Sequence, residues 1–155
     1  MSRSLRHEVE TEFRNLRLTL DHHRDVVDAC KLRSPTSVEL DALAVSLHSF
    51  YLGFENIFKR IALAIDGVLP KGPFSHIKLL ESMAVPTDNR RAVISTDLET
   101  DLLDLLNFRH VFRHAYAYDL KWTKMKHLVF NADETLAKAA KQIASFIDEV
   151  EQASR

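Results

Sequence analysis

The scarcity of glycine and proline constrains the fold of this chain more than any other feature. The chain has 155 residues, of which only three are glycine and four are proline. This leaves too few turn signals for a multi-stranded sheet and favours long helices. An apolar fraction of 46% and a charged fraction of 28% are typical of a globular protein that buries a sizeable core. We therefore expect an all-α protein in which residues 1–155 form a single domain.

Apolar residues recur at helical spacing along the first half of the chain. Residues 4–31 carry apolar side chains in steps of three, four or seven, which predicts a long amphipathic helix. After a break at Ser34 and Pro35, a wider apolar stripe continues to about Asp66, just before Gly67. A stripe of this width is typical of a helix in the centre of a bundle. The two helices should form an antiparallel hairpin.

The second half of the chain predicts three more helices. They are a short helix over residues 73–83, a helix that starts at Ser95 or Thr96, and a last helix that starts near Asn131 or Asp133 and frays before Arg155. The segment between the first two of these helices, residues 85–95, is expected to be a loop. The whole pattern predicts an antiparallel helical bundle of four to five helices.

The distribution of charge is uneven, although the net charge is only −1. Residues 109–127 contain five Lys or Arg side chains and one acid, Asp119, and so carry about +4. Together with Tyr116, Tyr118 and Trp122, which can stack on bases, such a segment can hold a phosphate backbone. A solvated basic turn explains the same charges equally well.

Cysteine content and hydropathy indicate the compartment. Cys30 is the only cysteine, so no intramolecular disulfide forms, and its place on an apolar stripe indicates a small core residue. We find neither a signal peptide nor an apolar run of membrane-spanning length. The expected location is cytoplasmic.

The segment FRHVFRHAYAYDLKW, residues 108–122, repeats an Arg-His pair after four residues. On a helix this spacing places Arg109 above Arg113 and His110 above His114. Like charges in this arrangement repel by a few tenths of a kcal/mol. An unfavourable arrangement of this kind indicates a functional role.

The spacing of His110 and His114 suits a metal ligand pair, so a zinc site was considered first. The pair lacks the adjacent glutamate of a metalloprotease, and the sequence nominates no third ligand. We therefore expect neither a metal nor another cofactor.

Arg109 and His114 offer a different chemistry. Five residues along a helix turn through about 140° and rise about 7.5 Å, but a long Arg side chain can reach along the axis if the helix ends near His114. A guanidinium supplies paired donors and a permanent charge to a phosphoryl oxygen, and an imidazole can pass a proton near neutral pH. These groups suffice for metal-free attack of an RNA 2′-hydroxyl on its own phosphate.

The pattern Arg109-x4-His114-x-Tyr116 resembles the R-x4-H-x-Y signature of the HepT-like ribonuclease toxins of the HEPN superfamily. The segments FYLGFENIFKRIA, residues 50–62, and SHIKLLESM, residues 75–83, are also similar to HepT-type sequence. The resemblance implies a HEPN-like homodimer whose active site is a cleft lined by Arg109 and His114 of both protomers. It also implies that the protein is an endoribonuclease toxin.

The resemblance further implies a protein partner. HepT-type toxins are paired with a minimal nucleotidyltransferase antitoxin, which transfers AMP from ATP to the tyrosine of the motif, here Tyr116, and so blocks the nuclease. One position departs from the family pattern, because many members have Asn or Asp directly after the motif arginine and this chain has His110.

Three residues are candidates for a supporting role: His110, Arg113 and Glu55. Glu55 lies close to Gly53, whose missing side chain would let another helix approach, and a buried Glu55 is expected to pair with Arg109 or Arg113. A solvated Glu55 is the alternative.

A non-catalytic HEPN-type module, which binds a nucleotide or a nucleotidyltransferase partner, is the alternative function. The presence of both Arg109 and His114 favours the nuclease. A homodimer is expected on separate grounds, because Leu103 and Phe108 are apolar residues that a single buried stripe does not accommodate.

Overall fold

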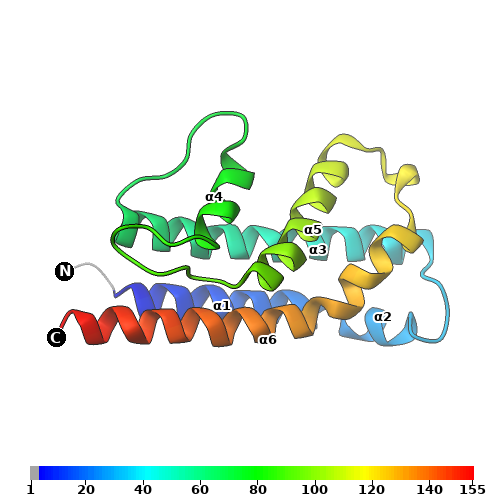
Figure 1. The fold of residues 1–155 in the computed structure, drawn as a ribbon. Coiled ribbons are helices and arrows are strands. Elements are labelled where there is room, and N and C mark those ends of the chain that lie inside the picture. Colours follow the sequence, from blue (N-terminus) through cyan, green and yellow to red (C-terminus); the bar gives the residue numbers. More distant parts are fainter. Residues whose placement is uncertain (1–3) are drawn as a thin grey trace.

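The computed structural model describes residues 4–155 (Figure 1), and within this range the elements are helical. The helices are α1 (Leu5–His22), α2 (Arg24–Ala29), α3 (Ser37–Ile61), α4 (Ser75–Met83), α5 (Thr96–His114) and α6 (Trp122–Ala153). A π-helical turn, Ala62–Asp66, extends α3, and a 3-10 turn, Ala117–Asp119, lies between α5 and α6. The expectation of an all-α bundle is confirmed.

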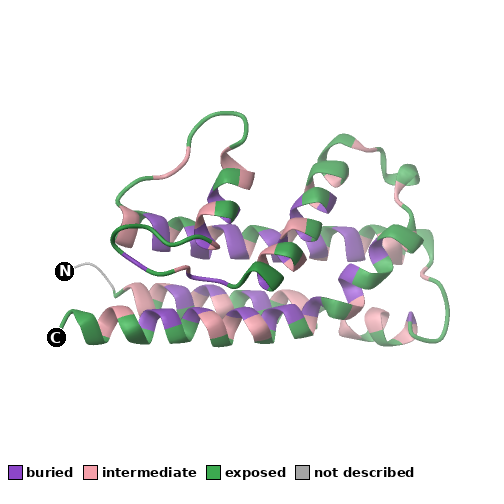
Figure 2. Ribbon diagram, in the orientation of Figure 1, coloured by how far each residue is buried: buried purple, intermediate pink, exposed green. Residues whose placement is uncertain are grey.

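Helix α3 is the centre of the bundle and packs against α1, α4, α5 and α6. Its buried residues lie on several sides (Figure 2), as its wide apolar stripe predicted. Phe50, Phe54 and Phe58 follow one another along it. The rings of Phe50 and Phe54 meet edge to face with centroids 4.9 Å apart, and those of Phe54 and Phe58 are stacked with centroids 6.4 Å apart. Thr36 begins the helix with a capping box, in which its hydroxyl accepts from the Glu39 N–H and the Glu39 carboxylate accepts from the Thr36 N–H.

Helices α1 and α6 lie side by side against α3 and bring the two ends of the described chain together (Figure 1). The Arg6 guanidinium donates to Glu151 at 2.9 Å, and the Arg17 guanidinium donates to Asp133 at 2.8 Å. These pairs fix the register of the two helices at both ends of their contact.

Gly53 marks the closest approach of α1 to α3. A Cβ atom at this position would lie 2.9 Å from Leu16 Cγ and closer still to Leu16 Cδ2. The expectation that Gly53 lets another helix approach is therefore confirmed. Cys30, only 4% exposed, is a core residue, as expected.

Two helix boundaries differ from the prediction. The helix predicted over residues 4–31 is broken at His23, whose backbone (φ −117°, ψ 34°) leaves the helical region and separates α1 from α2. The last helix begins at Trp122, about nine residues before the predicted start. Asp133 lies in the interior of this helix, and its carboxylate accepts hydrogen bonds from Arg17 and Arg24.

The apolar residues of α5 that pointed to a dimer are covered within one chain. Phe108 is only 8% exposed and belongs to the core, and Leu103 is partly buried against it. These two residues therefore do not support a dimer: Phe108 lies beside the start of α6, and Leu103, on another face of α5, is partly buried against the core of the same chain.

Residues 85–95 form a loop, as expected, but a buried side chain holds it in place. Arg90, with 2% of its side chain exposed, donates to both carboxylate oxygens of Asp66 at 2.8 Å and 3.0 Å. It also donates to the carbonyl oxygens of Ser82, Val85 and Arg91. Arg90 thereby fastens this loop to the end of α3 and to α4.

Among residues 4–155, no helix combines the length and the apolar character that crossing a membrane requires.

Candidate functional site

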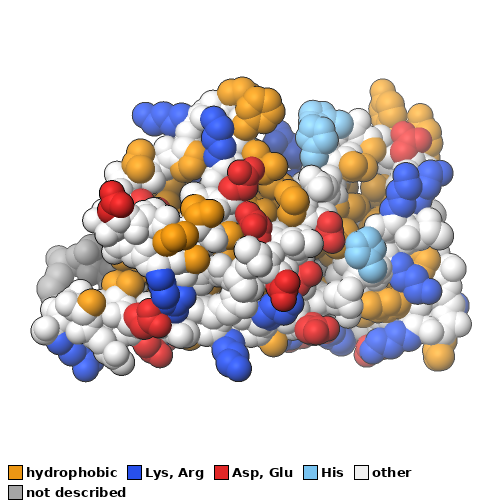
Figure 3. Space-filling model, in the orientation of Figure 1, with side chains coloured by type: hydrophobic (Ala, Val, Ile, Leu, Met, Phe, Trp, Pro, Cys, Tyr) orange, Lys and Arg blue, Asp and Glu red, His pale blue; other side chains and the backbone are white. Residues whose placement is uncertain are grey.

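The C-terminal end of α5 projects from the bundle together with α4, on the side of α3 away from α1 and α6 (Figure 1). Figure 3 shows histidine side chains at the outer end of this projection, with Lys or Arg side chains nearby. All the residues of the R-x4-H-x-Y pattern lie on this projection or directly after it.

Arg109 lies on the side of α5 that faces α3. Its side chain is partly buried, and its Nε is buried without a hydrogen-bond partner among the described residues. Burial raises the pKa of Tyr51 on α3, the charge of Glu55 raises it further, and the charge of Arg109 lowers it. Arg109 therefore lies close enough to α3 for its charge to act on the buried side chain of Tyr51.

His114 has the opposite environment. It is the last residue of α5 and is exposed, and its ring centroid lies 4.6 Å from that of His110. Because α5 stays helical through His114, the Cα–Cβ directions of Arg109 and His114 differ by about 140°. A single chain thus presents the two side chains on different faces of α5.

Two tyrosines after the helix are open to solvent. Tyr116 and Tyr118 are 71% and 82% exposed, and their rings are nearly parallel, with centroids 5.6 Å apart. Trp122 is partly buried and packs edge-on against Phe130. Of the three aromatic residues expected to stack on bases, the two tyrosines are the ones available.

The lysines that follow are exposed as well. Lys121, Lys124 and Lys126 have no ion-pair partner within residues 4–155. Lys121 and Lys124 border a surface groove of about 270 Å³ between α5 and the start of α6, whose floor includes Phe108 and Met125. The basic charge of this segment is therefore free to meet an anionic ligand.

Glu55 is buried, but its partners are not those expected. Its Oε1 accepts from His76 Nδ1 of α4 at 2.8 Å and lies 3.4 Å from Lys59 Nζ. Its Oε2 is buried without a partner, and the described residues provide no ion pair from Glu55 to Arg109 or Arg113. Helix α4 packs against α3 near Glu55 and supplies His76, which pairs with this carboxylate in place of the expected arginine.

The other two supporting candidates, His110 and Arg113, are both exposed on the last two turns of α5. Arg113 lies one turn beyond Arg109, as the four-residue spacing predicted. Among residues 4–155, no cluster of three His, Cys, Asp or Glu side chains suited to a metal ion surrounds His110 and His114.

His48 belongs to this region and was not singled out from the sequence. It lies on α3, and its ring packs against Phe112 of α5 with centroids 5.3 Å apart. Its Nδ1 is buried without a partner among the described residues. Burial lowers the pKa of His48, and the charges of Arg109 and Arg113 lower it further. The sequence signal that could have identified His48 was its spacing, because it lies three residues before Tyr51 on the stripe of α3 that faces α5.

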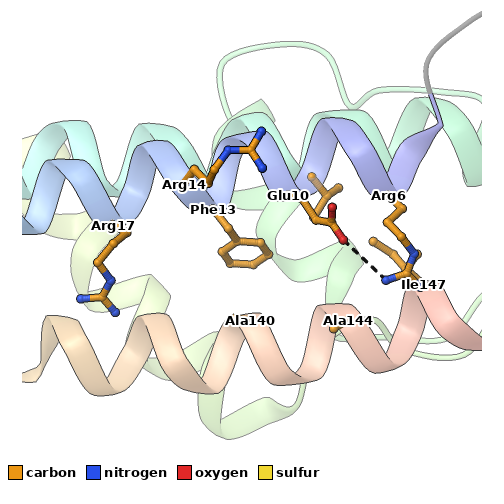
Figure 4. A pocket seen from close by; sticks show the side chains of 9 residues that line it. Arg6, Glu10, Phe13, Arg14, Arg17, Ala140, Ala144 and Ile147 are labelled. Carbon is orange, nitrogen blue, oxygen red and sulfur yellow. Dashed lines mark ion pairs between the residues drawn. The ribbon is translucent and has the colours of Figure 1, made fainter.

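A groove of about 430 Å³ between α1 and α6 is remote from these residues (Figure 4). Phe13, Ala140 and Ile147 form its apolar floor, and Arg6 and Arg17 at its edges are engaged in ion pairs with acids. Its lining comes entirely from α1 and α6, so it contains none of the candidate site residues.

Comparison with known protein families identifies the family of this helical bundle. Residues 42–150, more than two thirds of the chain, match the family model described as HepT-like protein. The chain therefore belongs to the HepT-like family of the HEPN superfamily. Comparisons with curated proteins and with solved structures gave no match. The family is one of HEPN-type toxin modules related to ribonucleases and to toxin–antitoxin systems.

Proposed function

We propose that the chain is a metal-independent endoribonuclease toxin of a toxin–antitoxin system. The observation that carries this proposal is the position of Arg109, His114 and Tyr116, which follow one another at the projecting end of α5, inside the range that matches the family. The exposed lysines after α5 supply the positive charge that an RNA backbone requires.

The reaction is attack of an RNA 2′-hydroxyl on the adjacent phosphorus. The new O2′–P bond forms as the P–O5′ bond breaks, which leaves a 2′,3′-cyclic phosphate and a 5′-hydroxyl. His114 exchanges a proton with the 2′-hydroxyl or with the leaving oxygen, and Arg109 stabilises the charge that builds up on the phosphoryl oxygens. Neither role requires a metal ion.

A homodimer completes this site. Since Arg109 and His114 of one chain lie on different faces of α5, a second copy placed against the end of α5 brings the missing group to the same phosphate. The cleft between the two protomers would then be lined by both copies of Arg109 and His114.

The proposed protein partner is a minimal nucleotidyltransferase that acts as the antitoxin. Tyr116 is open enough to reach the active site of another enzyme, and it lies two residues beyond His114. An AMP group on its hydroxyl would bring a phosphate towards Arg109 and Arg113 and place an adenine where a substrate base has to bind. Because the nucleotide is tethered, its effective concentration makes the block stronger than free AMP achieves.

An RNA digestion assay tests the proposal. The full chain is incubated with single-stranded RNA in EDTA, next to DNA of the same sequence, which lacks the 2′-hydroxyl. We expect Arg109→Ala and His114→Ala to lower the rate of RNA cleavage at least 100-fold, whereas His7→Gln, an exposed control on α1, leaves it unchanged. Thermal unfolding of each variant separates loss of activity from loss of fold.

Three results would overturn the proposal. They are full activity of both Ala variants, cleavage that stops in EDTA, and cleavage of DNA at the same rate as RNA. A wild-type protein that binds a nucleotide or a nucleotidyltransferase but cuts no RNA would support the non-catalytic alternative.

A further inference from the structure

His48 occupies a position that the R-x4-H-x-Y pattern does not include. It comes from α3, the central helix, and its ring lies against Phe112 of α5. Arg109 and Arg113 precede and follow Phe112 on α5, so His48 lies at the level of the expected catalytic arginine. Arg109 lies on the side of α5 that faces α3, away from His114. The imidazole of His48 lies on this same side of α5.

The two nitrogens of the His48 ring have different access. Nδ1 is buried and has no partner among the described residues, while the residue as a whole is partly exposed. Nε2 is therefore the nitrogen that can meet a substrate. The contact with Phe112 limits the orientations of the ring, which lies within electrostatic reach of Arg109 and Arg113.

Burial of the ring, and then the charges around it, lower the pKa of His48 and so keep the imidazole neutral near pH 7. Arg109 and Arg113 face it from α5, and both disfavour a third positive charge. On its own helix, Tyr51 lies about one turn away and Glu55 two turns away, and Glu55 is engaged with His76 and Lys59. A neutral imidazole has a free lone pair and can accept a proton.

We propose that His48 is a second catalytic histidine of the ribonuclease site and accepts the proton of the attacking 2′-hydroxyl through Nε2. The inference rests on the proposed function and divides the proton transfers between two residues. As O2′ bonds to phosphorus, its proton passes to His48. As the P–O5′ bond breaks, the leaving O5′ takes a proton from His114, which the second copy of the proposed homodimer brings to the same phosphate. One proton is taken up and one is released in each turnover, so the overall charge is unchanged.

A substrate with an activated leaving group separates the two roles. When the 5′-bridging oxygen of one phosphodiester in an RNA is replaced by sulfur, the leaving thiolate needs no proton from the enzyme. We expect His114→Ala to recover most of its lost activity on this substrate, because its missing acid is no longer required. We expect His48→Gln to remain impaired 100-fold or more on both substrates, since a base is still needed.

The pH dependence gives an independent measurement. In the wild type, protonation of His48 should reduce the rate of RNA cleavage only at a pH lower than the ordinary histidine pKa of about 6.5, because burial and the charges of Arg109 and Arg113 lower the pKa of His48. This acid limb should be absent in His48→Gln and present in the His7→Gln control. His48→Phe keeps an aromatic ring against Phe112. If this variant is as thermally stable as the wild type but inactive, the loss of activity does not come from a loss of packing.

The outcomes are distinct. If the wild type cuts RNA and His48→Gln cuts it equally fast, the inference is overturned and the proposed function stands. The same holds if the sulfur substrate restores the activity of His48→Gln and not that of His114→Ala. A wild type that cuts no RNA would overturn the proposed function and the inference with it.

Discussion

At the scale of single residues, Arg109 and His114 show how one helix creates two environments. Arg109 is partly buried against α3, and its Nε has no hydrogen-bond partner among residues 4–155, whereas His114 is exposed at the helix end. The four-residue spacing of the Arg-His pairs was readable from the sequence. The environment of each residue was not, because it depends on which helix packs against α5.

Replacing Tyr116 by Phe tests the proposed regulation. The ring remains for stacking and only the acceptor oxygen is lost, so Tyr116→Phe should cut RNA at close to the wild-type rate. It should escape silencing by the nucleotidyltransferase and ATP. Intact-mass spectrometry of toxin made together with the nucleotidyltransferase should find added AMP on the wild type and none on Tyr116→Phe.

Tyr118→Phe is the matched control, because Tyr118 is even more exposed and its ring lies parallel to that of Tyr116. It should be modified and silenced like the wild type. Modification that persists in Tyr116→Phe and disappears in Tyr118→Phe would assign the acceptor role to Tyr118 instead.

Glu39 predicts a pH dependence at the start of α3. The Arg33 guanidinium and the Thr36 N–H lower the pKa of the Glu39 carboxyl to about 2. A carboxyl whose pKa is depressed on folding stabilises the protein above its unfolded pKa of about 4.3, and this stabilisation is lost as the pH falls towards 2. NMR titration should find a pKa that rises towards 4.3 in Arg33→Ala, and an unchanged value would contradict the pairing.

At the scale of elements, polar contacts between helices were the hardest to predict. The apolar stripes and Gly67 were enough to place α3, because they are local signals. The pairing of Glu55 with His76, and of Asp133 with Arg17 and Arg24, joins residues far apart in the sequence. Such pairs depend on how the helices dock, which no local pattern contains.

Arg90 provides a prediction for the loop between α4 and α5. Arg90→Ala removes a buried guanidinium and leaves the Asp66 carboxylate and three carbonyl oxygens without their donor. We expect the free energy of unfolding to fall by about 3–5 kcal/mol, as for other broken buried ion pairs. Denaturant unfolding measures this difference.

The neighbouring residue supplies the control. Arg91 forms an exposed ion pair with Glu149, and Arg91→Ala should cost no more than about 1 kcal/mol. Equal losses in the two variants would show that Arg90 does not anchor the loop.

Gly53 makes a second prediction at this scale. In Gly53→Ala, the added methyl overlaps Leu16 of α1, and overpacking of this kind costs about 1–3 kcal/mol. Leu16→Ala alone leaves a cavity, but in the double variant the new methyl has room. A double-mutant cycle should therefore give a favourable coupling of at least about 1 kcal/mol, and strictly additive losses would contradict the close approach.

At the scale of the whole molecule, composition alone predicted the helical class, and the helical periodicity predicted most of the bundle. The argument for a dimer from Leu103 and Phe108 failed, because Phe108 is buried and Leu103 is partly buried within one chain. The argument that remains is chemical and depends on the separation of Arg109 and His114 around α5.

Sedimentation at micromolar concentration tests the dimer directly. We expect a species of twice the chain mass of 17.8 kDa. A monomer that nevertheless cuts RNA would show that one chain brings Arg109 and His114 to the same phosphate without a second copy.

The chemical ends of the cleaved RNA test the central claim most directly. Wild-type protein is incubated with a defined RNA in EDTA, and the product ends are determined by mass spectrometry. Attack by the 2′-hydroxyl predicts an upstream fragment that ends in a 2′,3′-cyclic phosphate and a downstream fragment that begins with a 5′-hydroxyl. Fragments with 3′-hydroxyl and 5′-phosphate ends, or RNA that stays intact, would contradict it.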